Sequence, residues 1–361
     1  MALLLLLFLL LIIIPISLLL TLSLIVRPKP TTIPIKGRHV FISGGSSGIG
    51  LALARQAAAE GARVSILARN PSNLQQARDS IRLSTGVDVA VFSADVRDFD
   101  AVKRAVEEAG PIDVLVCNQG VFVPRDLESQ DMETVKSTID VNVMGSFHLI
   151  KAALPSMKDR RDRGPGSIAL TSSQAGQFLT CGGKCCAKNQ RCTQYRKICI
   201  SNHGSTDEMK GCLQWVGIYG YSAYSASKFA LRGLAEALQQ EVISENIHVT
   251  LIFPPDTETP GFVEESKIRP EVTNIIAASS GAMKADDVAR KALNGIKSGS
   301  FFVPCNFEGL MLSLATAGMS PQKSALMAFV EVIAAGLLRI VALFFQWNWY
   351  DSIAKWNRKN K

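Results

Sequence analysis

From about residue 38, short apolar runs alternate with longer segments of helical periodicity, and this alternation constrains the fold most. The sequence predicts strands at residues 39–43, 63–68, 87–92, 112–117, 167–172, 247–253 and 300–304. It predicts helices at residues 51–60, 72–84, 98–109 and 222–243. Near-continuous apolar strands separated by helices are typical of a parallel sheet covered on both faces. We therefore expect an α/β fold, a doubly wound Rossmann-type sheet of about seven strands, in a single domain at residues 36–320.

The N-terminal end of the chain is apolar. Residues 2–26 contain no charged residue and consist mostly of Leu and Ile. A helix of this length rises about 1.5 Å per residue and can cross a hydrocarbon layer of about 30 Å, so residues 1–26 are predicted to be a transmembrane anchor. A cleaved signal peptide is the alternative, but it has a basic start and a shorter apolar core. Basic residues follow this run instead, which places the body on the cytosolic side; they are Arg27, Lys29, Lys36 and Arg38.

A second apolar stretch, residues 325–347, is predicted to associate with a membrane. Glu331 and Arg339 interrupt it and disfavour a simple lipid-facing span. An interfacial helix, a re-entrant segment and a span packed on another helix remain as alternatives. Residues 358–361 resemble a dibasic endoplasmic-reticulum retrieval signal, which is read in the cytosol. Either the stretch does not cross the membrane, or the tail is only a solvated basic end.

The net charge points to a membrane surface rather than to nucleic acid. Lys and Arg number 39 against 31 Asp and Glu, which gives a formal net charge of +8. The basic residues are scattered, and no basic stripe with interleaved aromatic residues occurs, so no nucleic-acid partner is expected. Attraction to anionic lipid headgroups accounts for the excess more simply.

A glycine-rich turn follows the first predicted strand. Gly44, Gly48 and Gly50 have the spacing G-x-x-x-G-x-G between a strand and a helix. Glycine allows a tight turn and lets backbone N–H groups approach a pyrophosphate at the start of a helix. The turn therefore predicts a dinucleotide site, and its other members are Ser46, Ser47 and Ile49.

The end of the second predicted strand indicates which dinucleotide binds. An acidic residue usually stands there to bind a free ribose hydroxyl, but this chain has Arg69. A guanidinium pairs well with a 2′-phosphate, and Ser46 and Ser47 add hydroxyl donors. The sequence therefore favours NADPH over NADH, with a solvated loop charge as the alternative for Arg69.

Tyr224-Ser-Ala-Ser-Lys228 carries a candidate acid–base pair. Residues at i and i+4 of a helix project from one face. The ordinary pKa of a phenol is about 10, and a cation one turn away favours the phenolate and lowers that pKa. Such a pair can exchange a proton with a substrate carbonyl or hydroxyl. Tyr221 has no lysine four residues later.

The glycine turn and the Tyr-x-x-x-Lys segment together resemble the short-chain dehydrogenase/reductase family. The resemblance implies that Tyr224 donates a proton to a carbonyl oxygen and that Lys228 holds the nicotinamide ribose. It also implies that Ser173 bonds the substrate oxygen and that Asn142 supports a water leading to Lys228.

The same resemblance implies further cofactor contacts after the strands. They are Asp95 and Val96 at the adenine, Asn118 and Gly120 at the nicotinamide pocket, and Pro254 and Thr257 at the carboxamide. Thr259 competes with Thr257 for that last role. Cys117 and Gln119 depart from the family's Asn-Asn-Ala-Gly pattern, which weakens any cofactor role for Gln119.

Residues 178–215 break the rhythm of the chain and hold six of its eight cysteines. Ser173 and Tyr224 lie 51 residues apart, and leaving out these 38 residues shortens the interval to 13, which is the family spacing. Ser173 is therefore favoured over Ser172, and 178–215 is predicted to be an insertion at the rim of the site, disordered or splice-derived. The cysteine spacing matches no paired zinc pattern, so no metal is expected, and disulfides are disfavoured in the cytosol. Whether the insertion impairs activity is left open.

Further stretches resemble the 3-ketosphinganine reductases of this family, particularly the plant forms. They include Pro254-Pro-Asp-Thr-Glu-Thr-Pro-Gly261, Cys305-Asn-Phe-Glu-Gly309 and the two apolar ends. The resemblance implies NADPH-dependent reduction of a long-chain ketone lipid, 3-oxosphinganine, to sphinganine at the endoplasmic-reticulum membrane, with the catalytic domain facing the cytosol. A reductase of sterols, retinoids or acyl ketones and a catalytically impaired binding form are the alternatives. A homo-oligomer is left open.

Overall fold

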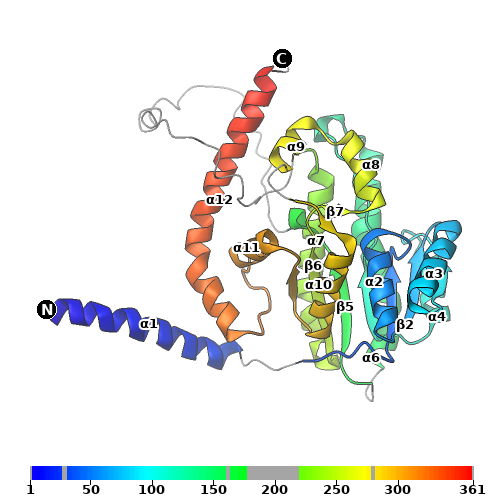
Figure 1. The fold of residues 1–361 in the computed structure, drawn as a ribbon, viewed down its shortest axis with the longest axis horizontal. Helices are drawn as coiled ribbons and strands as arrows, with labels where there is room; N and C mark the ends of the chain where they lie inside the picture. Colours follow the sequence, from blue (N-terminus) through cyan, green and yellow to red (C-terminus); the bar gives the residue numbers. More distant parts are fainter. Residues whose placement is uncertain (1, 27–30, 160–162, 177–218, 278–280, 360–361) are drawn as a thin grey trace.

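The centre of the fold is a seven-stranded sheet with the strand order β3-β2-β1-β4-β5-β6-β9 (Figure 1). This computed structural model describes residues 2–26, 31–159, 163–176, 219–277 and 281–359. The strands are β1 (His39–Ser43), β2 (Arg63–Ala68), β3 (Ala90–Ser93), β4 (Val114–Cys117), β5 (Gly166–Thr171), β6 (Ile247–Phe253) and β9 (Phe302–Pro304). Every neighbouring pair is parallel. The predicted doubly wound α/β fold is confirmed.

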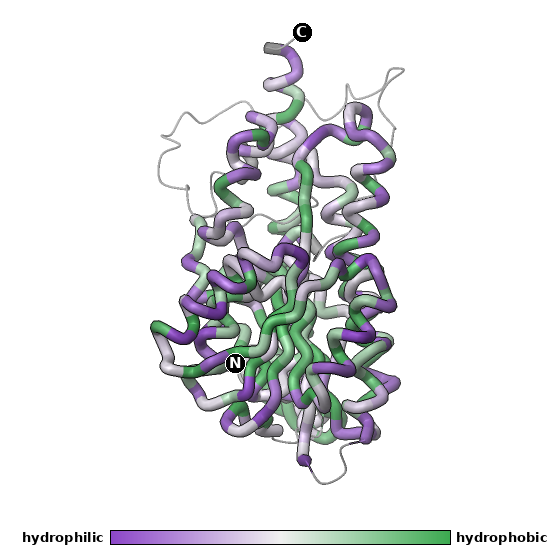
Figure 2. The backbone as a smooth tube through the Cα atoms, turned by 90° about the vertical axis from the view of Figure 1, so that its right-hand side faces the viewer, coloured by the Kyte–Doolittle hydropathy of each residue, from purple (hydrophilic) through white to green (hydrophobic). Residues whose placement is uncertain are grey.

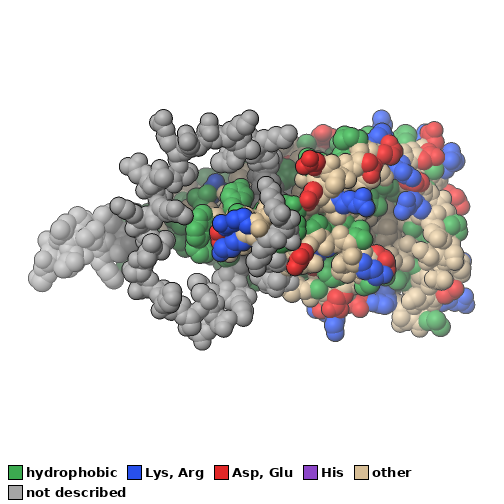
Figure 3. All heavy atoms as spheres, turned by 90° about the horizontal axis from the view of Figure 1, so that it is seen from above, with side chains coloured by type: hydrophobic (Ala, Val, Ile, Leu, Met, Phe, Trp, Pro, Cys, Tyr) green, Lys and Arg blue, Asp and Glu red, His purple; other side chains and the backbone are tan. Residues whose placement is uncertain are grey.

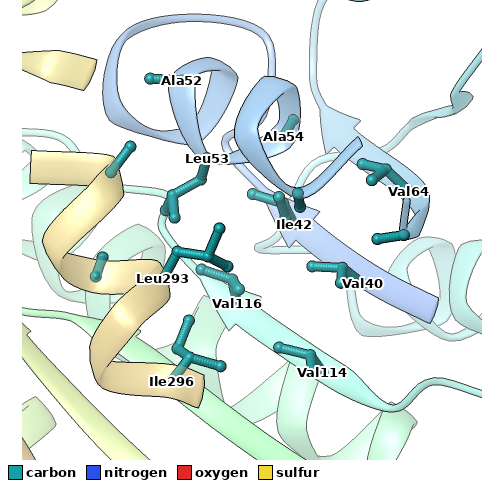
Figure 4. Packing of buried hydrophobic residues seen from close by; sticks show 14 of the residues in the cluster. Val40, Ile42, Ala52, Leu53, Ala54, Val64, Val114, Val116, Leu293 and Ile296 are labelled. Atoms are coloured by element: carbon teal, nitrogen blue, oxygen red, sulfur yellow. The ribbon is translucent and has the colours of Figure 1, made fainter. Parts of the chain in front are cut away.

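Helices cover both faces of the sheet. On one face lie α2 (Gly48–Ala59), α3 (Pro71–Thr85) and α10 (Ala285–Lys297). On the other lie α4 (Phe99–Ala109), α6 (Gly145–Lys158) and α7 (Ser222–Val242). Successive strand residues point to opposite faces, so Val40 and Ile42 join the first core and Phe41 joins the second. Figure 4 shows the first core, where side chains of β1, β2 and β4 meet α2 and α10.

The strands are hydrophobic along their length, whereas the flanking helices alternate between hydrophobic and hydrophilic residues (Figure 2). Burial on both faces explains why short continuous apolar runs were sufficient to predict the strands. Helix ends follow local chemistry as well. The Asn70 side chain caps α3 by accepting bonds from the N–H groups of Ser72 and Asn73 at 2.9 and 3.2 Å. Gly86 ends α3 with φ 73°, a left-handed conformation that suits glycine.

The helices α6 and α10 were not predicted from the sequence. Several short elements were not predicted either. They are α5 (Met132–Ile139), a π-helical turn (Asp140–Met144), α8 (Pro260–Ile268), α9 (Glu271–Ala277), α11 (Phe307–Ala315), and a separate parallel pair of β7 (Thr257–Glu258) and β8 (Met283–Lys284). Short 3₁₀ turns occur at Leu127–Ser129, Gln174–Gly176 and Ile243–Glu245. Several of these elements lie at the carboxyl edge of the sheet and enclose the site described below.

Two apolar helices stand at the ends of the chain: α1 (Ala2–Val26) and α12 (Ala325–Lys359). In Figure 1, α12 (red) runs beside the body, and α1 (blue) extends away from the lower end of α12. α12 is one continuous helix that packs on α11, and the buried residues in this contact are Leu312, Leu314, Leu338 and Ala342. Charged side chains of both signs are mixed over the body in Figure 3.

Among the described residues, one helix, Ala325–Arg358, is long and apolar enough to cross a membrane by length and composition. Within α1, the apolar segment Ile12–Val26 is shorter. The predicted anchor at residues 1–26 therefore stays a prediction. The predicted insertion, 178–215, lies outside the described residues.

The topology fixes where a ligand can bind. After β3 the chain returns to the other side of β1, so the connections from β1 and β4 leave in opposite directions. In such sheets the crevice at the carboxyl ends of these two strands is the binding site.

Candidate active site

A cleft of about 450 Å³ opens at the carboxyl edge of the sheet. Its walls come from the turn after β1, from the ends of β2, β4, β5 and β6, and from α7 and α8. The lining residues include 44, 46–49, 68–70, 94, 96, 118–122, 171–173, 221, 224, 228 and 254–257. Most of the predicted site residues therefore meet in one place.

The glycine turn has the geometry that a dinucleotide requires. Gly44 and Gly48 have φ values of 63° and 54°, a region that other residues rarely adopt. A Cβ atom on Gly50 would lie 2.2 Å from the Gly44 carbonyl oxygen, so only glycine fits there. Ser47 precedes α2 without a side-chain capping bond, and the start of α2 presents backbone N–H groups that favour a phosphate. These residues fit a bound dinucleotide.

The ends of β2 and β3 contribute unequally to the cleft. Arg69 is exposed and lines it. Val96 lines it as well, but the Asp95 carboxylate binds Arg97, with 2.7 Å between Oδ2 and Nη2. The hydrogen bond from Arg97 lowers the pKa of Asp95. The structure therefore brings Val96 to the cleft, whereas the Asp95 carboxylate is held by its neighbour.

Gln119 has a structural role that the sequence did not reveal. Its side chain is buried, its Oε1 accepts a bond from the Ser43 hydroxyl, and its Nε2 donates to Ser146 Oγ at 2.9 Å. The neighbouring Asn118 N–H donates to Ser43 Oγ at 3.1 Å. Gln119 thus connects β1, α6 and the loop after β4, and it fixes the position of Asn118 and Gly120 in the cleft.

Asn142 lies in the π-helical turn and is fully buried. Its Nδ2 donates to Val121 O at 2.9 Å and to Ser227 Oγ at 2.8 Å, while its Oδ1 accepts from Val121 N at 2.8 Å. A Cβ atom on Gly120 would lie 3.3 Å from Lys228 Nζ and 3.6 Å from Asn142 Oδ1. Asn142 therefore fastens the loop after β4 to α7, close to Lys228.

Tyr224, Lys228 and Ser173 converge at the end of β5. Lys228 Nζ lies 5.5 Å from the centroid of the Tyr224 ring and donates to Thr171 O at 2.9 Å. The Ser173 hydroxyl forms a hydrogen bond with the Tyr224 phenol. Ser172 instead donates its hydroxyl to the Lys228 carbonyl at 2.8 Å. The geometry thus gives the two serines different partners and puts Ser173 beside the phenol.

The pKa of the phenol differs from the sequence-based prediction. Burial raises the pKa of Tyr224 to about 12; the Ser173 bond opposes the rise and the charge of Asp256 adds to it. Burial also lowers the pKa of Lys228 to about 8. The predicted lowering of the phenol pKa is wrong for this structure, because loss of hydration raises it. The phenol is therefore protonated at neutral pH.

The turn after β6 holds both candidate threonines. The buried Thr257 donates its hydroxyl to Pro255 O at 2.8 Å. Thr259 caps α8 by accepting from Phe262 N at 3.1 Å, and its methyl carbon would lie 2.9 Å from a Cβ atom on Gly48. Both threonines and Pro254 line the cleft, so the carboxamide role of Thr257 stays a prediction.

Sequence reasoning missed the residues around the phenol. The rings of Phe122 and Tyr221 meet the Tyr224 ring at centroid distances of 5.7 and 5.9 Å. Asp256, Glu265 and Arg269 line the same cleft. Glu265 lies on the short helix α8 and Arg269 follows that helix directly, and only the Pro-rich start of the helix gave a signal in the sequence.

Comparison with known proteins agrees with this geometry. The family model for short chain dehydrogenase matches residues 38–185 and 213–269, and the chain belongs to this family. It is therefore an oxidoreductase that uses a nicotinamide cofactor. The match is interrupted within the segment that the sequence sets apart as an insertion.

Curated relatives extend over most of the chain. The 3-dehydrosphinganine reductase TSC10A of Arabidopsis thaliana is 61% identical, over 92% of this chain and 91% of the relative. TSC10B from the same plant is 56% identical over 93% and 90%. The 3-ketodihydrosphingosine reductase of Bos taurus is 34% identical over 92% and 89%.

Solved structures share the fold. A 3-ketoacyl-(acyl-carrier-protein) reductase from Brucella melitensis, complexed with NADH, matches with a TM-score of 0.57 and 21% identity over 76% of this chain and 99% of its own. A short chain dehydrogenase/reductase family protein matches with a TM-score of 0.56 and 24% identity, with the same coverage.

Proposed function

We propose that this chain reduces 3-ketosphinganine to sphinganine with NADPH, in sphingolipid synthesis at the endoplasmic-reticulum membrane. One observation carries the proposal: a half-buried, protonated phenol stands beside Ser173 and Lys228 in the cleft at the glycine turn, in a chain whose relatives at 61% and 56% identity are named 3-dehydrosphinganine reductases.

The proton chemistry follows from the positions of three side chains. Bound NADPH supplies a hydride to the carbonyl carbon of the substrate. Ser173 holds the carbonyl oxygen against Tyr224, which passes its proton to that oxygen as negative charge develops. A secondary alcohol is a weaker acid than a phenol, so the proton moves to the stronger base. The Lys228 ammonium then stabilises the tyrosinate that remains.

The cofactor preference rests on the end of β2. Arg69 is exposed at the cleft, and Ser46 and Ser47 line the same end of it. The adjacent Asn70 is occupied, because its side chain caps α3. A guanidinium with two hydroxyl donors suits the 2′-phosphate of NADPH, and no acidic side chain stands at this position to bind a free ribose hydroxyl.

The apolar ends of the chain suit a lipid substrate. α12 is long enough to cross a membrane, and it exposes aromatic side chains such as Trp347 and Tyr350 toward its C-terminal end, a position that favours the headgroup region. The long alkyl chain of the ketone partitions into the bilayer. The basic flank after α1 favours a cytosolic catalytic domain.

Product analysis tests the proposal. The purified full chain is incubated in lipid vesicles with 3-ketosphinganine and NADPH, and the lipid products are separated by mass spectrometry. We expect sphinganine to form, at a higher rate with NADPH than with NADH. Turnover of a sterol, retinoid or acyl ketone without any turnover of 3-ketosphinganine contradicts the proposal.

A further inference from the structure

A buried group of charged side chains stands in the cleft beside Tyr224. Asp256 lies in the turn after β6, Glu265 lies on α8, and Arg269 follows α8 directly. Together with Tyr221, these residues line the same cleft as the catalytic pair. We name them the headgroup cluster, and its members are Tyr221, Asp256, Glu265 and Arg269.

Arg269 stands at the centre of the headgroup cluster. Its Nη1 lies 2.9 Å from Asp256 Oδ2, and its Nη2 lies 2.5 Å from Glu265 Oε1. Its Nε donates to the Tyr221 hydroxyl at 3.0 Å, and that hydroxyl donates to Glu265 Oε1. The side chains of Arg269 and Glu265 are both only 7% exposed, whereas that of Asp256 is 30% exposed.

The charges of the headgroup cluster do not balance. Two carboxylates face one guanidinium, and Tyr221 is a neutral phenol. Burying an excess charge is costly unless a partner of opposite charge completes the group. Within the described residues, every hydrogen bond to the Glu265 carboxylate falls on Oε1, which leaves Oε2 for another donor. Burial raises the pKa of Glu265, so either a proton on this carboxylate or a bound cation completes the cluster.

The headgroup cluster lies close to the reacting atoms. The Tyr221 ring is 5.9 Å from the Tyr224 ring, and the charge of Asp256 contributes to the raised pKa of Tyr224. Lys228 is a cation beside the phenol, but its ammonium is bound to Thr171 O rather than to the cluster. In 3-ketosphinganine, an ammonium stands on the carbon next to the carbonyl. A ketone held by Tyr224 and Ser173 would thus carry its ammonium beside the reacting carbonyl, in the cleft that the cluster lines.

We infer that the headgroup cluster binds the ammonium of an amino-ketone substrate through Asp256 and Glu265 and selects amino ketones over ketones that lack the amine. The inference rests on the proposed reductase function and adds the residues that set its specificity. Arg269 orients the two carboxylates, and Tyr221 fixes Glu265. The alternative is a clamp that only fastens α8 to the turn after β6.

Two substrates and matched variants separate these roles. One substrate is 3-ketosphinganine, and the other is the ketone of equal length without the amine. The full chain is assayed with NADPH as wild type, Asp256→Asn and Glu265→Gln. Glu264→Gln is the control, because Glu264 lies on the same helix but is 72% exposed and pairs with Lys267.

We expect the wild type to favour the amino ketone by about 10- to 100-fold in kcat/KM, which is typical of a charge-assisted contact. Asp256→Asn and Glu265→Gln lose this preference, because kcat/KM falls more for the amino ketone than for the amine-free ketone, through a higher KM for the amino ketone. Glu264→Gln keeps the preference.

Several outcomes overturn the inference. Equal rates of the wild type on both ketones exclude an ammonium subsite while leaving the reductase intact, and this comparison holds even when a variant does not fold. An equal loss on both ketones in the variants shows a clamp only. If the wild type reduces neither ketone, the proposed function fails first and the subsite fails with it.

Discussion

Replacing Lys228 by methionine should stabilise the cofactor-free protein while it abolishes activity. Lys228 is buried in the cleft, and burial lowers its pKa from 10.5 to about 8. A difference of about 2.5 pH units corresponds to about 3 kcal/mol that the buried charge costs at pH 7. Methionine removes this cost but also the bond to Thr171 O, which contributes about 1–3 kcal/mol. The net gain is then about 1 kcal/mol, or about 2 °C in Tm.

The pH dependence makes this prediction specific. The pKa of Lys228 is lower in the folded protein than in the unfolded chain, so the unfolded chain binds more protons between pH 8 and 10.5. The wild type therefore gains stability as pH rises through this window, and the advantage of Lys228→Met disappears. Thermal unfolding of the full chain in detergent at pH 7 and pH 10 measures both effects.

The control is Lys103→Met, because the Lys103 side chain is 54% exposed on α4. We expect its Tm to stay within about 1 °C of the wild type at both pH values, as for most surface substitutions. A Lys228→Met protein that melts well below the wild type at pH 7, or that shows no dependence on pH, refutes the account of the buried ammonium.

Two substitutions in the cofactor half of the cleft give further predictions. Gly50→Ala brings a Cβ atom to 2.2 Å from the Gly44 carbonyl, so we expect NADPH binding, followed by fluorescence titration, to weaken at least about 10-fold. Gly233→Ala is the control, because a Cβ atom on Gly233 in α7 would have no other atom within 4 Å. This variant should keep NADPH binding and add about 1 kcal/mol of stability. Equal NADPH binding by both variants contradicts the close-approach argument. Arg69→Ala should raise the KM for NADPH about 10- to 100-fold and leave that for NADH unchanged, and a parallel rise for both cofactors argues against a 2′-phosphate contact.

The sequence predicted what depends on local pattern. Apolar runs such as 39–43 and 247–253 predicted strands because both faces of the sheet are covered. The spacing of Gly44, Gly48 and Gly50 predicted a turn whose conformations only glycine adopts easily. The interval between Ser173 and Tyr224 selected a serine that the structure places beside the phenol.

What the sequence missed depends on contacts between distant segments. The raised pKa of Tyr224 arises because α7, the end of β5 and the turn after β6 together exclude water from it. Gln119 departs from the family pattern, yet it finds partners on β1 and α6. Arg269 meets Asp256 across 13 residues and Tyr221 across 48, separations that no helical or strand period indicates.

The proton donated by Tyr224 is the central element of this account, and Tyr224→Phe tests it most directly. The variant and the wild type are compared for sphinganine formed from 3-ketosphinganine and NADPH, and NADPH binding is measured on the same samples. We expect the rate to fall by about 100- to 10,000-fold, the range typical of a lost general acid. The Kd for NADPH should stay within about threefold. A Phe variant that binds NADPH normally and keeps more than about a tenth of the wild-type rate contradicts the assignment of Tyr224 as the proton donor.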